Sequence, residues 1–152
     1  MIKVLFVCHG NICRSTMAEF VFKDMVRKEG LDDKFLILSA ATSTEEIGNG
    51  IHYGTRKKLR EVGIPFDQNK VAVQIKKADY DKFDYLIGMD ERNIVNMKRC
   101  FGGDENKKVF RLLEFVGKQR DIADPWYTGN FDETYNDVIE GLNGFLEKLE
   151  IK

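Results

Sequence analysis

A short segment near the start of the chain constrains its fold and chemistry more than any other feature. Residues 2–7 form a nearly continuous apolar run, which is typical of a parallel strand covered on both faces. The segment that follows this run directly consists of Cys8, His9, Gly10, Asn11, Ile12, Cys13, Arg14 and Ser15. The predicted strand therefore places a cysteine at the edge of a sheet, with an arginine one short loop away.

The residue types in this loop favour an anion-binding site. Gly10 and Asn11 tolerate positive φ, so the backbone can curl and turn its N–H groups inward. Helix signals start near Ser15, and the positive end of a helix would add to these donors. A thiol at the floor of such a nest has a lowered pKa and reacts as a thiolate. The planar guanidinium of Arg14 can bind two oxygens of a phosphoryl group at once.

We therefore expect Cys8 to be a nucleophile and Arg14 to bind phosphate. The predicted phosphate-binding residues are His9, Gly10, Asn11, Ile12, Cys13, Arg14 and Ser15. A cysteine and an arginine at this spacing often occur by chance, and the alternative is then a buried structural cysteine. The glycine and asparagine inside the loop and the hydroxyl after the arginine favour the functional interpretation.

The length and composition of the chain predict one domain, residues 1–152. The 152 residues are enough to bury a core, and 43% of them are hydrophobic. The net charge of −1 gives no overall field for nucleic acid, so no nucleic-acid partner is expected. No apolar stretch approaches the roughly 20 residues that span a bilayer, and residues 4–8 are too few for the apolar part of a signal peptide. We expect no membrane partner.

The three cysteines indicate a reducing compartment, so we expect a cytoplasmic protein without a disulfide framework. Cys8 and Cys13 do not form a zinc motif, because the chain has only two histidines and no second pair of ligands. No metal is therefore expected. Two roles are open for Cys13: packing beneath the loop, or trapping an oxidised Cys8 as a disulfide.

Alternating strand and helix patterns predict an α/β fold. Strands are expected over residues 2–7, 35–39, 85–89 and 108–112. Helices are expected over residues 16–29, 54–62, 91–100 and 132–150, with a short helical turn within 76–82 and with Asp90 as the N-cap of the third helix. This order implies a three-layer sandwich with a central four-stranded parallel sheet and helices on both faces. Ligands bind such sheets beyond the carboxyl ends of the strands, where Cys8 lies.

A long loop over residues 114–130 contains a second candidate segment, Asp124-Pro125-Trp126-Tyr127. Pro125 restricts Asp124 to an extended conformation, and the two aromatic residues offer flat surfaces that could wall a pocket. The alternative is a turn at Asp124 and Pro125 with the aromatic rings packed on the core. Cleavage of a phosphate ester requires a proton donor for the departing oxygen, and neither histidine is well placed in the sequence to supply one.

The Cys8–Ser15 loop resembles that of the low-molecular-weight protein tyrosine phosphatase family, which reads C-x-G-N-x-C-R-S. Further similar segments are Ser39-Ala40-Ala41-Thr42-Ser43, Phe83-Asp84-Tyr85, Met89-Asp90-Glu91 and Asp124-Pro125-Trp126-Tyr127. The resemblance extends from residue 2 to about residue 149. It implies a Rossmann-like phosphatase I fold and hydrolysis of phosphotyrosine monoesters in protein substrates, without metal or cofactor.

The resemblance also implies the role of each catalytic residue. Cys8 would form a phosphocysteine intermediate, Arg14 would bind the phosphoryl group in the transition state, and Asp124 would be the general acid and base. Inorganic phosphate or another oxyanion is expected to bind in the same site. The predicted substrate pocket consists of Glu45, Trp126 and Tyr127.

Two departures from the family pattern concern the surroundings of the site. Glu45 stands where the family usually has an aromatic residue. It either weakens the binding of small aryl phosphates and favours Lys or Arg beside the phosphotyrosine, or it points to solvent while Trp126 and Tyr127 form the wall alone. The segment over residues 69–71 lacks the usual histidine, which leaves the outer support of Asn11 unassigned.

Four other functions use related loops. A protein-arginine phosphatase of the same superfamily has Thr where Ile12 stands. An arsenate reductase needs two redox cysteines in addition to those of the loop, and only Cys100 remains in this chain. In a phosphocysteine carrier of a sugar transport system, Arg14 and the Asp124 segment would be out of place, because a carrier must not hydrolyse its own intermediate. A phosphotyrosine-binding module would need neither a thiolate nor an acid.

Overall fold

The computed structural model describes residues 1–149, and one sheet forms its centre. The strands are β1 (Ile2–Cys8), β2 (Phe35–Ala41), β3 (Tyr85–Gly88) and β4 (Val109–Arg111). They pair in parallel in the order β2-β1-β3-β4. The predicted four-stranded parallel sheet is therefore confirmed. Residue 150, the predicted end of the last helix, and the rest of the predicted domain to residue 152 lie outside the described residues.

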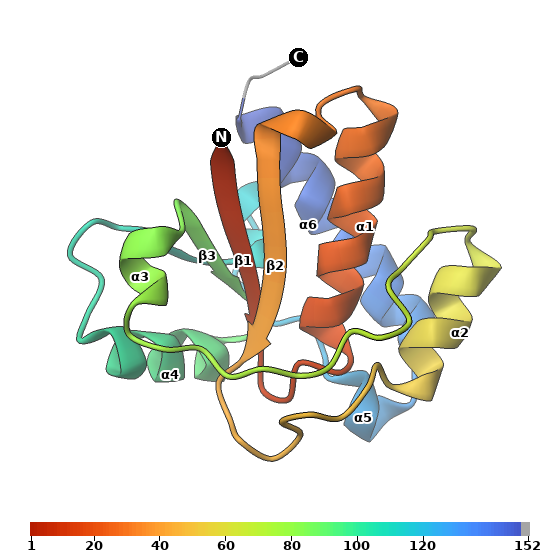
Figure 1. Cartoon of the computed structure of the whole chain (residues 1–152), viewed down its shortest axis with the longest axis horizontal. Helices are drawn as coiled ribbons and strands as arrows, with labels where there is room; N and C mark the ends of the chain where they lie inside the picture. The colour runs from red at the N-terminus through yellow and green to blue at the C-terminus, as the bar shows by residue number, and fades with distance from the viewer. Residues whose placement is uncertain (150–152) are drawn as a thin grey trace.

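Helices cover both faces of this sheet, as predicted. The helices are α1 (Arg14–Lys28), α2 (Tyr53–Glu61), α3 (Asp79–Lys82), α4 (Glu91–Phe101), α5 (Pro125–Thr128) and α6 (Phe131–Lys148), with single 3-10 turns at η1 (Asp32–Lys34) and η2 (Leu112–Val116). One face packs against α1 and α6 and the other against α3 and α4 (Figure 1). Within residues 1–149, no helix combines the length and the apolar character needed to cross a membrane.

β1 is an inner strand that buries side chains on both faces. Val4 and Phe6 pack into the core beneath α1 and α6, whereas Leu5 and Val7 pack into the core beneath α3 and α4. This two-sided burial explains why the run is apolar throughout. The next two strands in sequence lie on opposite sides of β1, with β2 on one side and β3 on the other. Open α/β sheets bind ligands beyond the carboxyl ends of the strands at such a reversal of strand order. Cys8 is the last residue of this strand.

The first helix begins earlier than predicted. It starts at Arg14 rather than at residue 16, and the carbonyl of Cys13 already accepts the N–H of Met17 at 3.0 Å. Arg14 and Ser15 therefore belong to the first helical turn. Their side chains take their directions from a regular helix instead of from a flexible loop.

The region over residues 114–130 was wrongly predicted to lack secondary structure. It contains the end of η2 and the whole of α5. Proline suits the first position of a helix, where its missing N–H costs nothing and its fixed φ is already helical. Pro125 occupies that position in α5, and Gly129 ends the helix with a φ of 69°.

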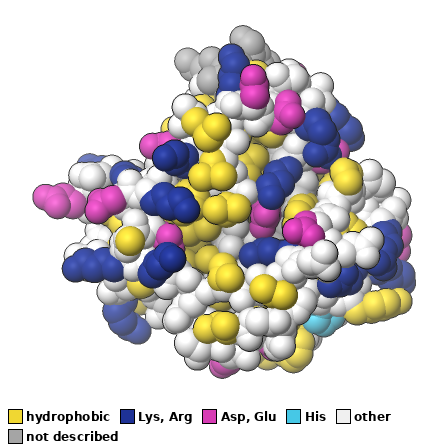
Figure 2. Space-filling model, in the orientation of Figure 1, with side chains coloured by type: hydrophobic (Ala, Val, Ile, Leu, Met, Phe, Trp, Pro, Cys, Tyr) yellow, Lys and Arg dark blue, Asp and Glu magenta, His cyan; other side chains and the backbone are white. Residues whose placement is uncertain are grey.

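An irregular segment over residues 71–75 pairs with the end of the edge strand β2. The Ala41 N–H donates to the Val73 carbonyl at 2.7 Å, and the Ile75 N–H donates to the Ala41 carbonyl at 2.8 Å. In the view of Figure 2, hydrophobic side chains gather near the centre with Lys and Arg around them. Leu38 of β2 and Val73 of the paired segment are both exposed. The pairing covers part of a sheet edge and holds the preceding residue, Lys70, close to the Cys8–Ser15 loop.

α6 approaches η2 closely at two glycines. A Cβ atom on Gly141 would lie 2.6 Å from Cγ of Leu112, and one on Gly144 would lie 2.5 Å from Cγ1 of Val116. Both distances are far below van der Waals contact. The missing side chains therefore let α6 pack against the turn that leads into the Asp124 segment.

Replacing Gly141 with alanine is expected to destabilise the fold. Overpacking against Leu112 costs about 1–3 kcal/mol, which outweighs the gain of about 1 kcal/mol in helix propensity. The free energy of unfolding from urea denaturation measures the net effect. The control is Asn143→Ala on the exposed face of the same helix, which is expected to be neutral or slightly stabilising. Equal stability of the two variants would contradict the close-packing interpretation.

Candidate active site

The Cys8–Ser15 loop curls around the sulfur of Cys8. Asn11 has a φ of 57°, in the left-handed region that the sequence pattern anticipated. This conformation turns the Asn11 N–H toward the Cys8 sulfur, to which it donates at 3.3 Å. The sulfur is also 3.0 Å from Oγ of Ser15, and Cys8 is 3% exposed. Two hydrogen-bonding groups thus surround the sulfur, and both can donate to a thiolate.

The side chain of Asn11 holds the loop in this shape. Its Nδ2 donates to Oγ of Ser15 at 2.8 Å and to Oγ of Ser39 at 2.9 Å. Its Oδ1 accepts from the backbone N–H of Val73 at 3.2 Å and from Nζ of Lys70 at 3.0 Å. The outer support of Asn11, which the sequence left unassigned, is thus the ammonium of Lys70 together with a backbone N–H.

Arg14 is buried beneath the loop, with only 2% of its surface exposed. Its Nη1 donates to Oδ2 of Asp90 at 2.7 Å and to the carbonyl of Ile122 at 2.9 Å, and its Nη2 lies 3.4 Å from Oδ2 of Asp124. Burial alone would lower the pKa of the guanidinium, but the neighbouring Cys8, Asp124 and Asp90 raise it above its ordinary value. The site therefore contains a permanent buried cation.

Asp90 is a site residue that the sequence interpretation missed. It was predicted as the N-cap of α4 and as part of a segment similar to the family, but not as a site residue; its Oδ1 does accept the Asn93 N–H at 2.7 Å. Its second carboxylate oxygen contacts Arg14. The order of the strands could have indicated that Asp90 belongs to the site. Asp90 follows β3, which is the neighbour of β1, so it lies at the same edge of the sheet as Cys8.

Asp124 caps the short helix α5 and faces the pocket. Its Oδ1 accepts the Trp126 N–H at 3.0 Å, and its backbone is extended, with φ of −79° and ψ of 114°, as expected before proline. The second oxygen points to Arg14. One carboxylate oxygen thus fixes the side chain to α5, while the other lies beside the buried cation.

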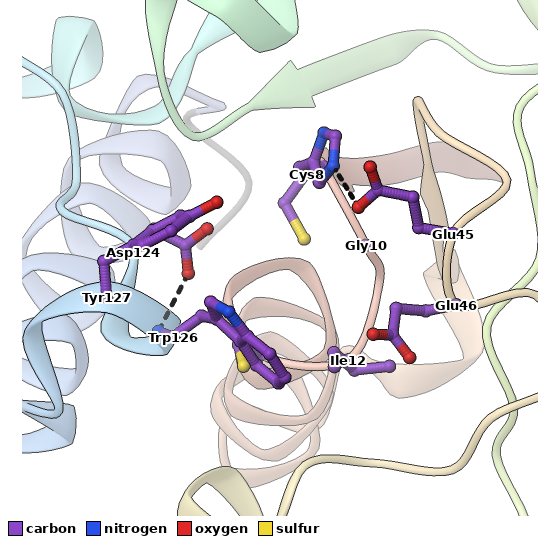
Figure 3. Close-up of a pocket in the computed structure, with 10 residues that line it drawn as sticks. Cys8, Gly10, Ile12, Glu45, Glu46, Asp124, Trp126 and Tyr127 are labelled. Carbon is purple, nitrogen blue, oxygen red and sulfur yellow. Dashed lines mark hydrogen bonds and ion pairs between the residues drawn. The ribbon is translucent and has the colours of Figure 1, made fainter.

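The structure brings most of the predicted residues to one pocket (Figure 3). The residues that line it are Cys8, His9, Gly10, Ile12, Cys13, Glu45, Glu46, Asp124, Trp126 and Tyr127. The other three predicted residues, Asn11, Arg14 and Ser15, are buried, and each contacts a residue that lines the pocket: Asn11 and Ser15 contact the Cys8 sulfur, and Arg14 lies beside Asp124. Glu46 was not predicted from the sequence.

The two sides of the pocket differ in their residues and in their support. On one side, Trp126 packs its ring against the edge of His52, with centroids 5.5 Å apart, and His52 stacks on Phe131 at 5.2 Å. On the other side, Glu45 lies 2.8 Å from Nε2 of His9. Glu45 therefore borders the pocket, although most of its side chain is exposed.

The two cysteines of the loop differ in their electrostatic environment. Burial raises the pKa of the Cys13 thiol far above its usual range, and the charges of Cys8 and Asp124 act in the same direction. The surroundings of Cys13 therefore favour its neutral thiol form. Cys8, Cys13 and Cys100 are all free cysteines. Within residues 1–149, no three His, Cys, Asp or Glu side chains are grouped so that they could hold a metal ion.

Comparisons with known proteins agree with this site. The chain matches the family described as low molecular weight phosphotyrosine protein phosphatase over residues 3–152. It is 42% identical over 152 residues to the low molecular weight protein-tyrosine-phosphatase YfkJ of Bacillus subtilis, with 99% of this chain and 97% of the relative covered. The low molecular weight phosphotyrosine protein phosphatase of Gallus gallus is 41% identical over 153 residues, with 95% and 94% covered.

Solved structures show the same similarity. The crystal structure of YfkJ has a TM-score of 0.94 to this chain at 42% identity, with 99% of this chain and 95% of that chain covered. The low molecular weight protein tyrosine phosphatase of Streptococcus pyogenes has a TM-score of 0.90 at 43% identity, with 100% and 95% covered. Because the similarity in sequence and in fold runs along nearly the whole chain, this protein belongs to the low molecular weight phosphotyrosine protein phosphatase family.

Proposed function

We propose that this protein hydrolyses phosphotyrosine monoesters in protein substrates through a phosphocysteine intermediate on Cys8. One observation carries the proposal. The Cys8 sulfur accepts an N–H of a curled loop at the carboxyl end of an inner strand, in a pocket that a carboxylate from a second loop also lines. That arrangement joins a nucleophile, an oxyanion site and a proton donor, which are the groups that this hydrolysis requires. Membership of the family supports the same activity.

In the first step the Cys8 thiolate attacks phosphorus in line, so that a phosphorus–sulfur bond forms while the phosphorus–oxygen bond to tyrosine breaks. Backbone N–H groups of the loop and the guanidinium of Arg14 would hold the equatorial oxygens and stabilise their charge. Asp90 and Ile122 already fix the orientation of that guanidinium. Preorganised donors of this kind need no reorganisation during the reaction.

Asp124 would donate a proton to the departing tyrosine oxygen and then take a proton from the attacking water. In this second step water displaces the sulfur, and inorganic phosphate is the product. Ser15, whose Oγ lies 3.0 Å from the sulfur, can donate a hydrogen bond to the departing thiolate of Cys8. Cys13 is unsuited as the nucleophile, because burial keeps its thiol protonated.

The pocket supports an aromatic substrate. The exposed rings of Trp126 and Tyr127 border the site of attack and can pack against the phenyl ring of phosphotyrosine. Ile12 offers no hydroxyl group, which favours phosphotyrosine over phosphoarginine. Turnover of matched phosphotyrosine, phosphoserine and phosphoarginine peptides tests the substrate class directly.

We further propose a cytoplasmic location, because a free cysteine nucleophile depends on a reducing environment.

Cys8→Ser is expected to abolish turnover while inorganic phosphate still binds. The loop N–H groups and Arg14 remain in this variant, and only the nucleophile is lost. Turnover of a phosphotyrosine peptide and phosphate binding by calorimetry measure the two effects. Cys100→Ser, which changes the same atom outside the pocket, is the control. More than about a tenth of wild-type turnover, which is only ~1.4 kcal/mol of barrier, would contradict the mechanism.

Asp124→Ala is expected to reduce the turnover of phosphotyrosine by about 10²–10⁴-fold, the usual contribution of a general acid. The loss is expected to shrink for aryl phosphates whose phenols have a low pKa, because such groups depart without a proton. The measurement is kcat across a series of leaving groups. An equal loss across the series would instead mean that Asp124 acts by capping α5.

Glu45→Trp is expected to lower KM for phosphotyrosine several-fold with little change in kcat. Stacking adds ~0.5–1.5 kcal/mol beyond area burial, and the contact is the same in the ground and transition states. Glu45→Gln removes the charge without adding a ring. It therefore separates the effect of losing the negative charge from the effect of gaining a stacking surface. A wild-type preference for Lys or Arg beside the phosphotyrosine is expected to weaken in both variants. If KM and this preference stay unchanged, Glu45 has no part in substrate recognition.

A further inference from the structure

Lys70 is a charged residue with its amine turned toward the interior, on the far side of the Cys8–Ser15 loop from the pocket. Its Nζ donates to Oδ1 of Asn11 at 3.0 Å and to the carbonyl of Ser39 at 3.2 Å. Neither contact is an ion pair. Lys70 is only half-buried, but its ammonium gives up part of its hydration for two neutral acceptors, so the placement requires an explanation.

The charges around Lys70 partly offset this cost. Glu19, which is 3% exposed, lies on α1 behind the loop, where it accepts from Oγ of Ser39 and from Nζ of Lys23 at 2.6 Å. Burial lowers the pKa of the Lys70 amine, while the charge of Glu19 acts against the decrease and that of Lys23 adds to it. Cys8 and Asp67 also favour the protonated form. A single residue, Asn11, links Lys70 to the sulfur of the proposed nucleophile, because its side chain accepts from Lys70 and its backbone N–H donates to the sulfur.

The backbone brings Lys70 to this position through tertiary pairing. The segment over residues 71–75 is bonded to Ala41 at the end of β2, and the Val73 N–H donates to the same Asn11 oxygen as Lys70 does. The two donors approach Asn11 from one segment. They leave Nδ2 of Asn11 directed at Ser15 and Ser39.

We propose that Lys70 is a positioning residue for the phosphate-binding loop. Its ammonium holds the Asn11 carboxamide so that Asn11 keeps its left-handed backbone and its N–H stays directed at the Cys8 sulfur. Its positive charge, placed behind the loop, adds to the attraction for an anion bound in front of it. The inference rests on the proposed function only in that the loop binds a phosphoryl group.

The first test compares Lys70→Met with the wild type in two measurements that need no turnover. We expect inorganic phosphate to bind about tenfold more weakly, as for loss of a hydrogen bond from a charged group. The rate at which iodoacetate alkylates Cys8 at a fixed mildly acidic pH is also expected to fall several-fold. Lys77→Met removes the same charge from an exposed position a few residues along, and both properties are expected to stay unchanged in it.

Two further variants separate positioning from general stabilisation. Lys70→Gln keeps a donor without the charge, and its phosphate affinity is expected to lie between those of the wild type and Lys70→Met. Asn11→Ala combined with Lys70→Met closes a double-mutant cycle, in which the losses of phosphate affinity are expected to be clearly non-additive because Lys70 acts through Asn11. Urea denaturation identifies any variant that does not fold. If Lys70→Met does not fold, Lys70→Gln replaces it in the double-mutant cycle.

The results that would overturn the Lys70 proposal differ from those that would overturn the proposed function. Unchanged phosphate affinity and alkylation in both Lys70 variants, or additive losses in the cycle, would overturn the positioning role. A wild-type protein that binds phosphate but does not turn over phosphotyrosine would contradict the proposed function alone, and the Lys70 result would stand.

Discussion

The left-handed backbone of Asn11 is the constraint on which the rest of the site depends. Asparagine tolerates a φ of 57° better than most residues other than glycine, but it keeps one orientation there only where its surroundings hold it. The groups that do so belong to α1, to β2 and to the segment that carries Lys70 and Val73. The anion-binding loop is continuous in sequence, but its shape is therefore a product of tertiary structure. The Cys8 sulfur receives its backbone donor only when all three parts of the chain are in place.

The second constraint is the charge of Arg14. A buried guanidinium is tolerated because two carboxylates, from the ends of different elements, lie beside it. The contacts are unequal: Asp90 holds Nη1 at 2.7 Å, and Asp124 lies 3.4 Å from Nη2. A general acid cannot donate its proton while it remains an ion-paired carboxylate. Phosphoryl oxygens that take over the longer contact would separate Asp124 from the cation and leave Asp90 to hold the guanidinium.

Residue patterns alone predicted the local part of this site. The distant residues Asp124, Trp126 and Tyr127 were predicted only through the family resemblance, and two long-range contacts were not predicted at all. A strand, a turn and a helix start in fixed order around Cys8, so their relative positions follow from short-range geometry. The contact of Arg14 with Asp90 joins residues 76 positions apart, and that of Asn11 with Lys70 joins residues 59 apart. No local pattern marks either contact. The sheet order did limit where Asp90 could lie, because parallel neighbours end at one edge, but nothing comparable limited Lys70.

The pocket walls rest on supports of different stiffness, and this difference bears on specificity. His52 caps α2 by accepting the Gly54 N–H at 2.9 Å, and its ring joins Trp126 to Phe131 at the start of α6. That wall is therefore tied to two helices. The opposite wall is Glu45, whose side chain is 69% exposed and whose contact there is to His9. An exposed pair of this kind is weakly held. In the proposed function, the substrate residue next to the phosphotyrosine would meet this adaptable side, while the phosphoryl group and the aromatic ring would meet groups that the fold has already fixed.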